Sequence, residues 1–197
     1  MSIAAVARRR FLAILGAAAV VPAAARAGAL PVIGQAAGFA LVRETGAPLA
    51  LSDLAGKVVL VDFIYTGCPD ICPLLTQKLA EVQDALGPAF GKDVVFVSIT
   101  MDPAVDTPEV LRDYAESLGC NPAGWAFLTG SADEIRKAAF AYGVYFSKTP
   151  SGFIDHNAMT SLVDRSGRLR VQYMGTAFDP AELERDLRSL IGEAGAT

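Results

Sequence analysis

Two runs of apolar, mostly β-branched residues constrain the fold of this chain more than any other feature. Lys57–Ile64 and Val94–Ile99 are almost uninterrupted by polar side chains, as expected of strands buried on both faces of a sheet. The segment between them places apolar residues at steps of three and four, the pattern of an amphipathic helix: Leu75, Leu79, Val82 and Leu86. Strand, helix and strand in this order predict a right-handed parallel unit.

The rest of the pattern surrounds this unit with further strands and helices. Phe39–Val42 and Pro48–Leu51, separated by Glu44-Thr45-Gly46, predict a short hairpin. The elements expected after the second buried strand are a helix opened by Asp106–Glu109 and closed by Gly119, a strand at Trp125–Leu128, a helix from Ser131 to about Tyr142, an extended segment at 142–146, a polar loop at 147–155, strands at 158–163 and 169–173, and a last helix from Asp179-Pro180. This order predicts a thioredoxin-like α/β fold with a central mixed sheet, an N-terminal hairpin extension and flanking helices.

The composition describes a globular chain that can bury a proper core. The sequence has 197 residues, of which 52% are hydrophobic and 19% are charged, which excludes intrinsic disorder as a description of the whole. The length suits one domain and an additional segment.

That additional segment is the N-terminus, where residues 1–27 have the pattern of an export signal. Arg8-Arg9-Arg10 precedes an uncharged run, Phe11–Ala25, and a small-x-small site, Ala25-Arg26-Ala27. The arginines and Phe11 resemble a twin-arginine signal. An uncleaved membrane anchor is the alternative, although a spanning helix needs about 20 apolar residues. Residues 28–38, rich in Gly, Ala and Pro, predict a linker to a domain at 39–197.

The charge balance argues against nucleic acid as a partner. Removal of residues 1–27 takes away four arginines and no acids, which leaves 13 basic residues against 21 acids, a net charge of −8. An acidic domain without a basic patch lacks the electrostatic footprint of a nucleic-acid-binding protein.

The chemistry is expected at Cys68 and Cys72, which follow the first buried strand at a strand-to-helix turn. The third cysteine, Cys120, makes an odd count that is too small for a disulfide scaffold. A helix N-terminus favours thiolate over thiol, so the pair is predicted to be nucleophilic and able to bind a soft metal. A bridge across so small a loop would add little stability.

Three interpretations of the pair remain: a redox dithiol, a soft-metal site, or inert buried cysteines. The third is disfavoured because Pro69-Asp70 and Pro73 are turn residues, and turns lie at surfaces. Two thiolates alone suit Cu(I), whereas an added nitrogen ligand would allow Cu(II) as well. A carboxylate is a poor Cu(I) ligand, so Asp70 is expected to shape the turn.

His156 is the only histidine of the chain and could supply that nitrogen. A lone histidine is ordinarily a surface or core residue, but this one precedes the strand at 158–163, a place that faces the cysteines in thioredoxin-like folds. The neighbouring Asp155 could orient the imidazole, or could simply be a solvated acid. Asp102, at the end of the second buried strand, is interpreted first as a turn former.

These residues carry a resemblance to a known family. The sequence is similar to the SCO/SenC family of copper-binding thioredoxin-like proteins that assist cytochrome c oxidase assembly, over about residues 39–190. The shared motifs are Cys68-Pro69-Asp70-Ile71-Cys72-Pro73, Ser98–Pro103 with Asp106-Thr107-Pro108, Trp125–Gly130, and Asp155-His156 before a strand that ends in Asp164. Gly67 departs from the bulkier residue that many members have there.

The resemblance implies that Cys68 and Cys72 bind copper through sulfur and His156 through a ring nitrogen. It further implies that copper is delivered to the binuclear site of an oxidase subunit, or that the cysteines of that subunit are first reduced, with other copper chaperones or thiol reductants as possible partners. The implied location is the periplasm or the outer face of the bacterial inner membrane. Many members keep a membrane anchor, so the export signal leaves tethering open.

A second class of function stays open beside the copper chaperone. In an envelope thiol-disulfide oxidoreductase or peroxidase-like enzyme, Cys68 would be the attacking residue and Cys72 the resolving one. Cys68 lies nearer the turn, where exposure is usually greater. A reduced pair is needed for copper and a disulfide forbids it, so both functions can coexist. Cys120 is interpreted as an isolated thiol.

Overall fold

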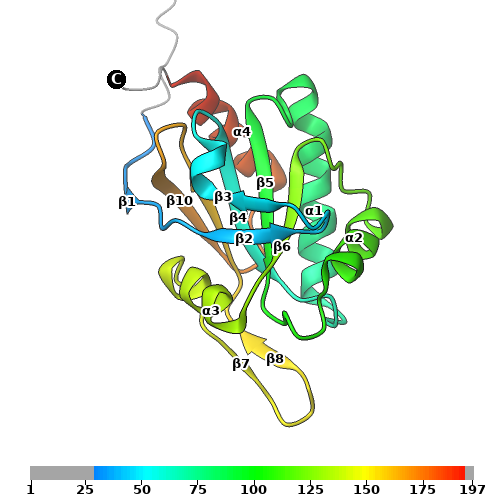
Figure 1. Ribbon diagram of the computed structural model, residues 1–197. Coiled ribbons are helices and arrows are strands. Elements are labelled where there is room, and N and C mark those ends of the chain that lie inside the picture. Colours follow the sequence, from blue (N-terminus) through cyan, green and yellow to red (C-terminus); the bar gives the residue numbers. More distant parts are fainter. Residues whose placement is uncertain (1–28, 194–197) are drawn as a thin grey trace, which may run out of the picture.

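A computed structural model describes residues 29–193 of the chain (Figure 1). The predicted export signal at 1–27 and the last four residues lie outside this range. The elements are β1 (Gly34–Gln35), β2 (Ala40–Arg43), β3 (Pro48–Ala50), β4 (Val58–Ile64), α1 (Ile71–Leu86), β5 (Val94–Thr100), α2 (Pro108–Ser117), β6 (Trp125–Thr129), α3 (Ala132–Ala141), β7 (Phe146–Lys148), β8 (Ile154–His156), β9 (Met159–Val163), β10 (Arg168–Met174) and α4 (Pro180–Gly192), with short 3-10 turns at Leu51–Leu54 and Gly87–Ala89.

The centre of the molecule is an eight-stranded mixed sheet in the order β1-β10-β9-β4-β5-β6-β2-β3. Strands β4, β5 and β6 are parallel to one another, and every residue of all three is buried. Burial on both faces explains why their sequences lack the alternation of a half-exposed strand. The predicted parallel unit and the thioredoxin-like arrangement are confirmed.

Helix α1 follows β4 and begins before Leu75, the first residue of the predicted apolar face. It starts at Ile71, so Cys72 and Pro73 lie in its first turn, where proline is tolerated. Its apolar face is the predicted one, with Leu75, Leu79, Val82 and Leu86 buried. The helix ends at Leu86 and is followed by Gly87, which has a positive φ of 55°, and α1 packs beside α4. The turn between β4 and α1 therefore lies at the carboxyl end of the central strand.

The two edges of the sheet come from the N-terminal part of the chain. The predicted hairpin is present as β2 and β3, and β2 also pairs with β6. The predicted linker at 28–38 needs a correction, because β1 lies inside it and pairs with β10. Backbone N–H groups of Ile33 and Ala36 donate to carbonyls of β10 and the preceding turn. The ladder between β1 and β10 is made by backbone groups, so the Gly- and Ala-rich composition that predicted a linker does not prevent this segment from forming an edge strand.

A second departure concerns residues 142–156. The extended segment expected at 142–146 begins only at Phe146, because Tyr142 and Gly143 still belong to the end of α3. The residues expected as a polar loop form a two-stranded hairpin, β7–β8, which is not part of the main sheet. Figure 1 shows this hairpin extending from the body beyond α3. His156 is thus the last residue of a short strand rather than a loop residue.

The remaining elements agree with the sequence pattern. Strands β9 and β10 are antiparallel, β9 pairs with β4, and α4 closes the described chain. Side chains cap each of these later helices: Thr107 for α2, Ser131 for α3 and Asp179 for α4. No helix within residues 29–193 combines the length and apolar character needed to cross a membrane.

Candidate functional site

The two cysteines lie together at the carboxyl end of β4. Cys68 is in the turn and is 9% exposed, while Cys72 is in the first turn of α1 and is 2% exposed. The backbone N–H of Cys72 donates to Sγ of Cys68 over 3.4 Å. All three cysteines of the described chain are free thiols. The site therefore offers a reduced, nearly buried pair with a narrow opening at Cys68.

The two thiols differ in acidity. Burial by itself would raise the pKa of Cys68, but hydrogen bonds from the backbone N–H groups of Asp70 and Cys72 and from the side chains of Cys72 and Tyr65 outweigh it and lower that pKa. For Cys72, burial raises the pKa strongly, and the neighbouring Cys68 and Asp62 raise it further. The lowered pKa of Cys68 follows the direction expected at a helix N-terminus, whereas for Cys72 the helix end does not compensate for burial.

Asp106 fixes the turn that carries Cys68. Its carboxylate has no exposed surface and accepts hydrogen bonds from the backbone N–H and the hydroxyl of Thr66 and from the hydroxyl of Thr100. Thr66 lies two residues before Cys68, so the loop after β5 holds the loop after β4. From the sequence, Asp106 was placed at the start of a helix and in a shared motif without this role, and the residue that caps the helix is Thr107. The sequence signal that could have indicated this role was an acidic residue directly before the capping Thr107.

His156 lies at the end of β8 and is half-buried. Its Nδ1 is 3.0 Å from the carbonyl oxygen of Ile154, so that carbonyl, and not the predicted Asp155, orients the ring. A shallow groove of about 580 Å³ lies beside it, lined by Tyr145, Phe146, Ser147, Asp155, His156 and Asn157. With Nδ1 directed at the carbonyl, Nε2 is the nitrogen left for another partner.

Tyr65 connects the histidine to the cysteines and was not singled out from the sequence. Its ring meets the His156 ring edge to face, with centroids 5.8 Å apart. Burial and the adjacent Cys68 raise the pKa of Tyr65, and the hydrogen bond between them contributes to the lowered pKa of Cys68. The only sequence signal for this role of Tyr65 was its position as an aromatic residue between the end of the strand and Cys68.

The structure does not bring the three predicted ligands into one closed cluster. Within residues 29–193, no group of three His, Cys, Asp or Glu side chains lies close enough together to hold a metal ion. The two sulfurs are adjacent, whereas His156 contacts Tyr65 instead. The donor set of the two thiols suits a soft metal in chemistry.

Asp102 anchors the β7–β8 hairpin, which carries His156 and is called the histidine hairpin below. Its carboxylate accepts a hydrogen bond from Nζ of Lys148 in β7 over 2.7 Å, and its backbone N–H donates to the hydroxyl of Thr100. It therefore does more than form a turn, because it attaches β7 to the end of β5. Cys120 is a buried thiol beyond α2 whose pKa burial raises to about 12.

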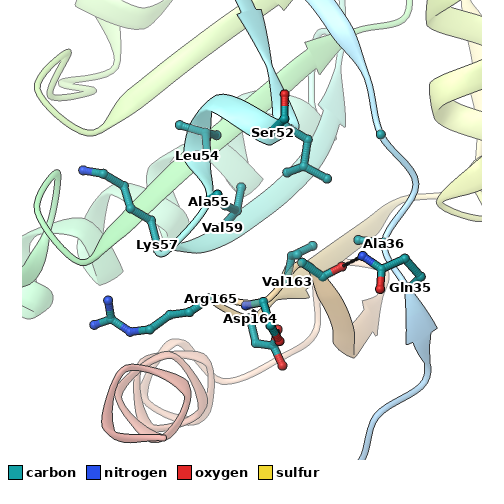
Figure 2. Close-up of a pocket in the computed structure, with 14 residues that line it drawn as sticks. Gln35, Ala36, Ser52, Leu54, Ala55, Lys57, Val59, Val163, Asp164 and Arg165 are labelled. Atoms are coloured by element: carbon teal, nitrogen blue, oxygen red, sulfur yellow. Dashed lines mark hydrogen bonds between the residues drawn. The ribbon is translucent and has the colours of Figure 1, made fainter. Parts of the chain in front are cut away.

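A separate cavity of about 390 Å³ lies at the opposite end of the sheet, where β4 begins. Figure 2 shows Lys57 and Arg165 on one side of it and Gln35 on the other. The cations are already engaged: Lys57 donates to the carbonyl of Gly91, and Arg165 donates to the carbonyl of Gly56 and to Asp93. Both cations that line this cavity are thus bound within the chain, and the thiol pair, which is the candidate site, lies at the other end of the sheet.

A C-x-x-x-C dithiol at the carboxyl end of the central strand of this sheet defines a thioredoxin-like protein. The sequence model of the SCO1/SenC family matches residues 33–192, so the chain belongs to the SCO1/SenC family.

Individual relatives agree with this assignment. Protein SenC of Rhodobacter capsulatus is 36% identical over 130 residues, which are 64% of this chain and 57% of SenC. The chain thus spans little more than half the length of that relative. Among solved structures, copper-bound ScoI of Bradyrhizobium japonicum has a TM-score of 0.70 at 32% identity, covering 79% of this chain and 99% of that one. A disulfide switch has been identified in BsSco, a member of the Sco family of cytochrome c oxidase assembly proteins. Its structure has a TM-score of 0.73 at 27% identity, covering 84% of this chain and 99% of that one.

Proposed function

We propose that this chain binds one copper ion through Sγ of Cys68, Sγ of Cys72 and Nε2 of His156, and that it serves the assembly of cytochrome c oxidase. The observation that carries the proposal is the adjacent, reduced thiol pair with its hydrogen bond from the Cys72 N–H to Cys68 Sγ. Thiolates are the ligands that Cu(I) prefers, and imidazole extends the site to Cu(II). Copper-bound structures of related Sco proteins support the choice of metal.

The histidine would complete the site through movement of its hairpin. Strands β7 and β8 pair only with each other among the described strands, so the hairpin can shift without breaking the main sheet. Tyr65, now in contact with both Cys68 and His156, would turn aside as the imidazole approaches. The carbonyl of Ile154 would keep the proton on Nδ1 and so leave Nε2 free to bind the metal.

The thiols would join the metal in a fixed order. Cys68 has the lowered pKa and the larger exposure, so it is the first sulfur to bind. Cys72 holds its proton more firmly because it is buried, and it follows once the metal displaces that proton. The apolar side chains of Ile71 and Leu74, which are 47% and 57% exposed on the first turn of α1, would contact the protein that receives the copper.

The proposed recipient is an oxidase subunit with a binuclear copper site, to which the chain delivers copper or whose cysteines it reduces beforehand. Other copper chaperones and thiol reductants are further proposed partners. The matching location is the periplasm or the outer face of the bacterial inner membrane, which agrees with the export pattern of residues 1–27. The description of BsSco as an assembly protein supports this role.

Thiol-disulfide exchange is a second candidate, favoured by the unequal acidity of the pair. A more acidic, more exposed Cys68 suits the attacking thiol, and a buried Cys72 suits the resolving thiol. The disulfide form would be unable to hold copper.

Copper titration of the reduced chain tests the three-ligand site. One equivalent should bind to the parent protein with a sulfur-to-Cu(II) charge-transfer band, and His156→Ala should weaken Cu(II) binding by at least about 10-fold and alter the spectrum. Asp155→Ala is the matched control, because the hydrogen-bond partner of the ring is the carbonyl of Ile154, and it should behave as the parent. Unchanged Cu(II) affinity and spectrum in His156→Ala would exclude the histidine as a ligand.

A further inference from the structure

Two methionines face one another at the same end of the sheet as the thiol pair. Strands β9 and β10 are antiparallel, and their register ends with Met159 opposite Met174. Both β4 and β10 run antiparallel to β9, so β10 ends at the edge of the sheet where Cys68 follows β4. Of the three methionines within residues 29–193, only Met101 lies outside this pair.

The two methionine side chains lie on the same face of the sheet. Residues directly opposite each other in an antiparallel pair share a face, with Cβ atoms roughly 4.5–5.5 Å apart. The pair two residues further back identifies this face, because Nε2 of Gln172 donates to Oγ of Ser161 over 3.1 Å and to the carbonyl of Tyr142 over 2.9 Å. Tyr142 caps the end of α3. Met159 and Met174 therefore project from the face that α3 covers, just beyond the end of that helix.

The pair combines one fixed sulfur with one that solvent reaches. Met159 is half-buried and packs against the core, whereas Met174 is 76% exposed, more than any other large hydrophobic side chain among the described residues. Core packing explains the first methionine and not the second. Both side chains are long and unbranched, so their thioether sulfurs can approach one another from facing positions.

The methionine pair lies beside the aromatic residues that lead to the thiols. Val61 of β4 faces Ser161 of β9, and two steps further along this register Phe63 faces Met159. The ring of Tyr142 packs on Phe63 with centroids 6.1 Å apart, which agrees with the face assigned above. Tyr65 follows two residues after Phe63, and its ring contacts His156. An ion at the methionine pair would therefore lie next to the base of the histidine hairpin.

The backbone that carries the pair is already held in place. The N–H of Gly175 donates to the carbonyl of Ala158 over 2.9 Å, one step beyond the methionines. Asn157 joins the start of β9 to the end of α3, because its Oδ1 accepts from the N–H of Tyr145 and its Nδ2 donates to the carbonyl of Gly143. Only side-chain rotation is needed to bring the two sulfurs onto one ion, and a site on fixed elements loses little freedom on binding.

We propose that Met159 and Met174 form a second metal site, which binds one Cu(I) ion through their two thioether sulfurs. Thioethers are soft ligands, so the site selects Cu(I) over Zn(II) and other harder ions. They carry no charge, so the site binds the ion more weakly than a pair of thiolates does. The inference goes beyond the proposed three-ligand site and needs neither Cys68 nor Cys72. Its place at the same edge of the sheet makes the pair a holding site for Cu(I) beside the thiols.

Labelling the methionine methyl groups with carbon-13 tests the site directly. The parent for this test is the full chain with Cys68→Ser, Cys72→Ser and Cys120→Ala, which removes every thiol. Anaerobic addition of Cu(I) should shift the methyl resonances of Met159 and Met174 together and saturate at one equivalent, while the resonance of the buried Met101 stays in place. Zn(II) should shift neither resonance of the pair, because it is a poor partner for thioethers.

Replacement of single sulfurs measures their contribution to affinity. Met174→Leu and Met159→Leu keep the side chain apolar and close to its original volume, and each should weaken Cu(I) binding by at least about 10-fold in competition with a coloured Cu(I) chelator. Met101→Leu is the matched control and should keep the affinity of the parent. Met174 is largely exposed, so its replacement does not disturb the core, and this variant decides the question if Met159→Leu does not fold.

The proposal is overturned if Cu(I) leaves both methyl resonances of the pair in place, or if Met174→Leu binds Cu(I) as tightly as the parent. A shift of the Met174 resonance alone would also overturn it, because it would show adventitious binding to one exposed thioether. The proposed three-ligand site is tested separately, by Met174→Leu in the chain with its cysteines intact, which should retain Cu(II) binding. Loss of either site thus leaves the result for the other unchanged.

Discussion

The two ends of β4 differ in how their buried carboxylates are compensated. Where β4 begins, Asp164 and Arg170 are both buried and form an ion pair. Towards the end of β4, Asp62 and Asp106 are buried without a cationic partner among residues 29–193. Arg170 donates to Asp164, to Glu193 and to the carbonyls of Leu30 and Pro31. At that end the buried carboxylate of Asp164 is paired with a cation, and the contacts of Arg170 join distant parts of the chain. At the cysteine end the donors to Asp62 and Asp106 are neutral hydroxyl and backbone N–H groups.

The pKa values express the same difference. Burial would raise the pKa of Asp164, but hydrogen bonds from the backbone of Arg168 and the side chains of Ser166, Arg170 and Arg168 outweigh it and bring the pKa to about 2. Burial of Asp62 is opposed by little more than Ser98, and its pKa rises to about 7. The paired carboxylate at one end of the sheet therefore stabilises the fold, whereas burial of Asp62 at the other end costs stability.

The largest effect is expected from Arg170→Met. The substitution removes the cation that Asp164 and Glu193 share and leaves the Asp164 carboxylate buried with fewer donors. Loss of one partner of a buried ion pair costs about 3–5 kcal/mol, so the free energy of unfolding in urea at neutral pH should fall by that amount. Arg188→Met is the control, since its pair with Glu184 is exposed and i,i+4 and is worth about 0.5 kcal/mol. Equal losses in both variants would contradict the comparison.

Asp62→Asn should instead stabilise the chain, in a pH-dependent way. The folded pKa of Asp62 is about 7 against 3.8 for the ordinary group. The unfolded chain therefore loses this proton first as the pH rises, and stability falls between these two values by up to roughly 4 kcal/mol. Asparagine does not titrate, so the variant should exceed the parent by up to that amount at about pH 8 and by little near pH 4. Urea unfolding at several pH values measures this.

Asp164→Asn is the opposite control. Its folded pKa of about 2 lies below the ordinary value of 3.8, so its contribution is fully present above 3.8 and is lost as the pH falls towards 2. The variant should be less stable than the parent at neutral pH and equal to it at about pH 2. A variant that behaved like Asp62→Asn would show that the two ends do not differ in this way.

The smallest effect on stability is expected from Lys148→Ala, which frees the histidine hairpin from Asp102. Half of the Lys148 side chain is exposed, so the pair is worth less than about 1 kcal/mol. Amide hydrogen exchange in β7 and β8 should nevertheless rise about three-fold or more, while exchange in β4 and β5 stays unchanged. Uniform exchange changes in both regions would show that the hairpin is part of the main cooperative unit.

Much of the cysteine end could be predicted from the sequence, because its determinants are local. The buried strands follow from continuous apolar runs, the face of α1 from its periodicity, and the later helices from their caps. Cys68 and Cys72 are neighbours through one helical turn, which spacing alone reveals. These features depend on residues close together in the chain.

The features that escaped prediction depend on contacts between distant segments. Strands β7 and β8 have three residues each, too few for a period to appear, and β1 is held by backbone hydrogen bonds that composition does not encode. Asp62 was visible as a charge inside an apolar run, but its donor Ser98 lies 36 residues away on another strand. The contact of Tyr65 with His156 likewise needed the fold.

The Arg170 side chain has a topological consequence. One guanidinium binds the carbonyl of Leu30 and the carboxylate of Glu193, so the first and last parts of the described chain are within reach of a short peptide (Figure 1). A linker of a few residues could join them, and new termini could be opened at the tip of the β7–β8 hairpin as a circular permutation. In the natural order, Leu30 lies at the end of the domain opposite to the turn that carries Cys68.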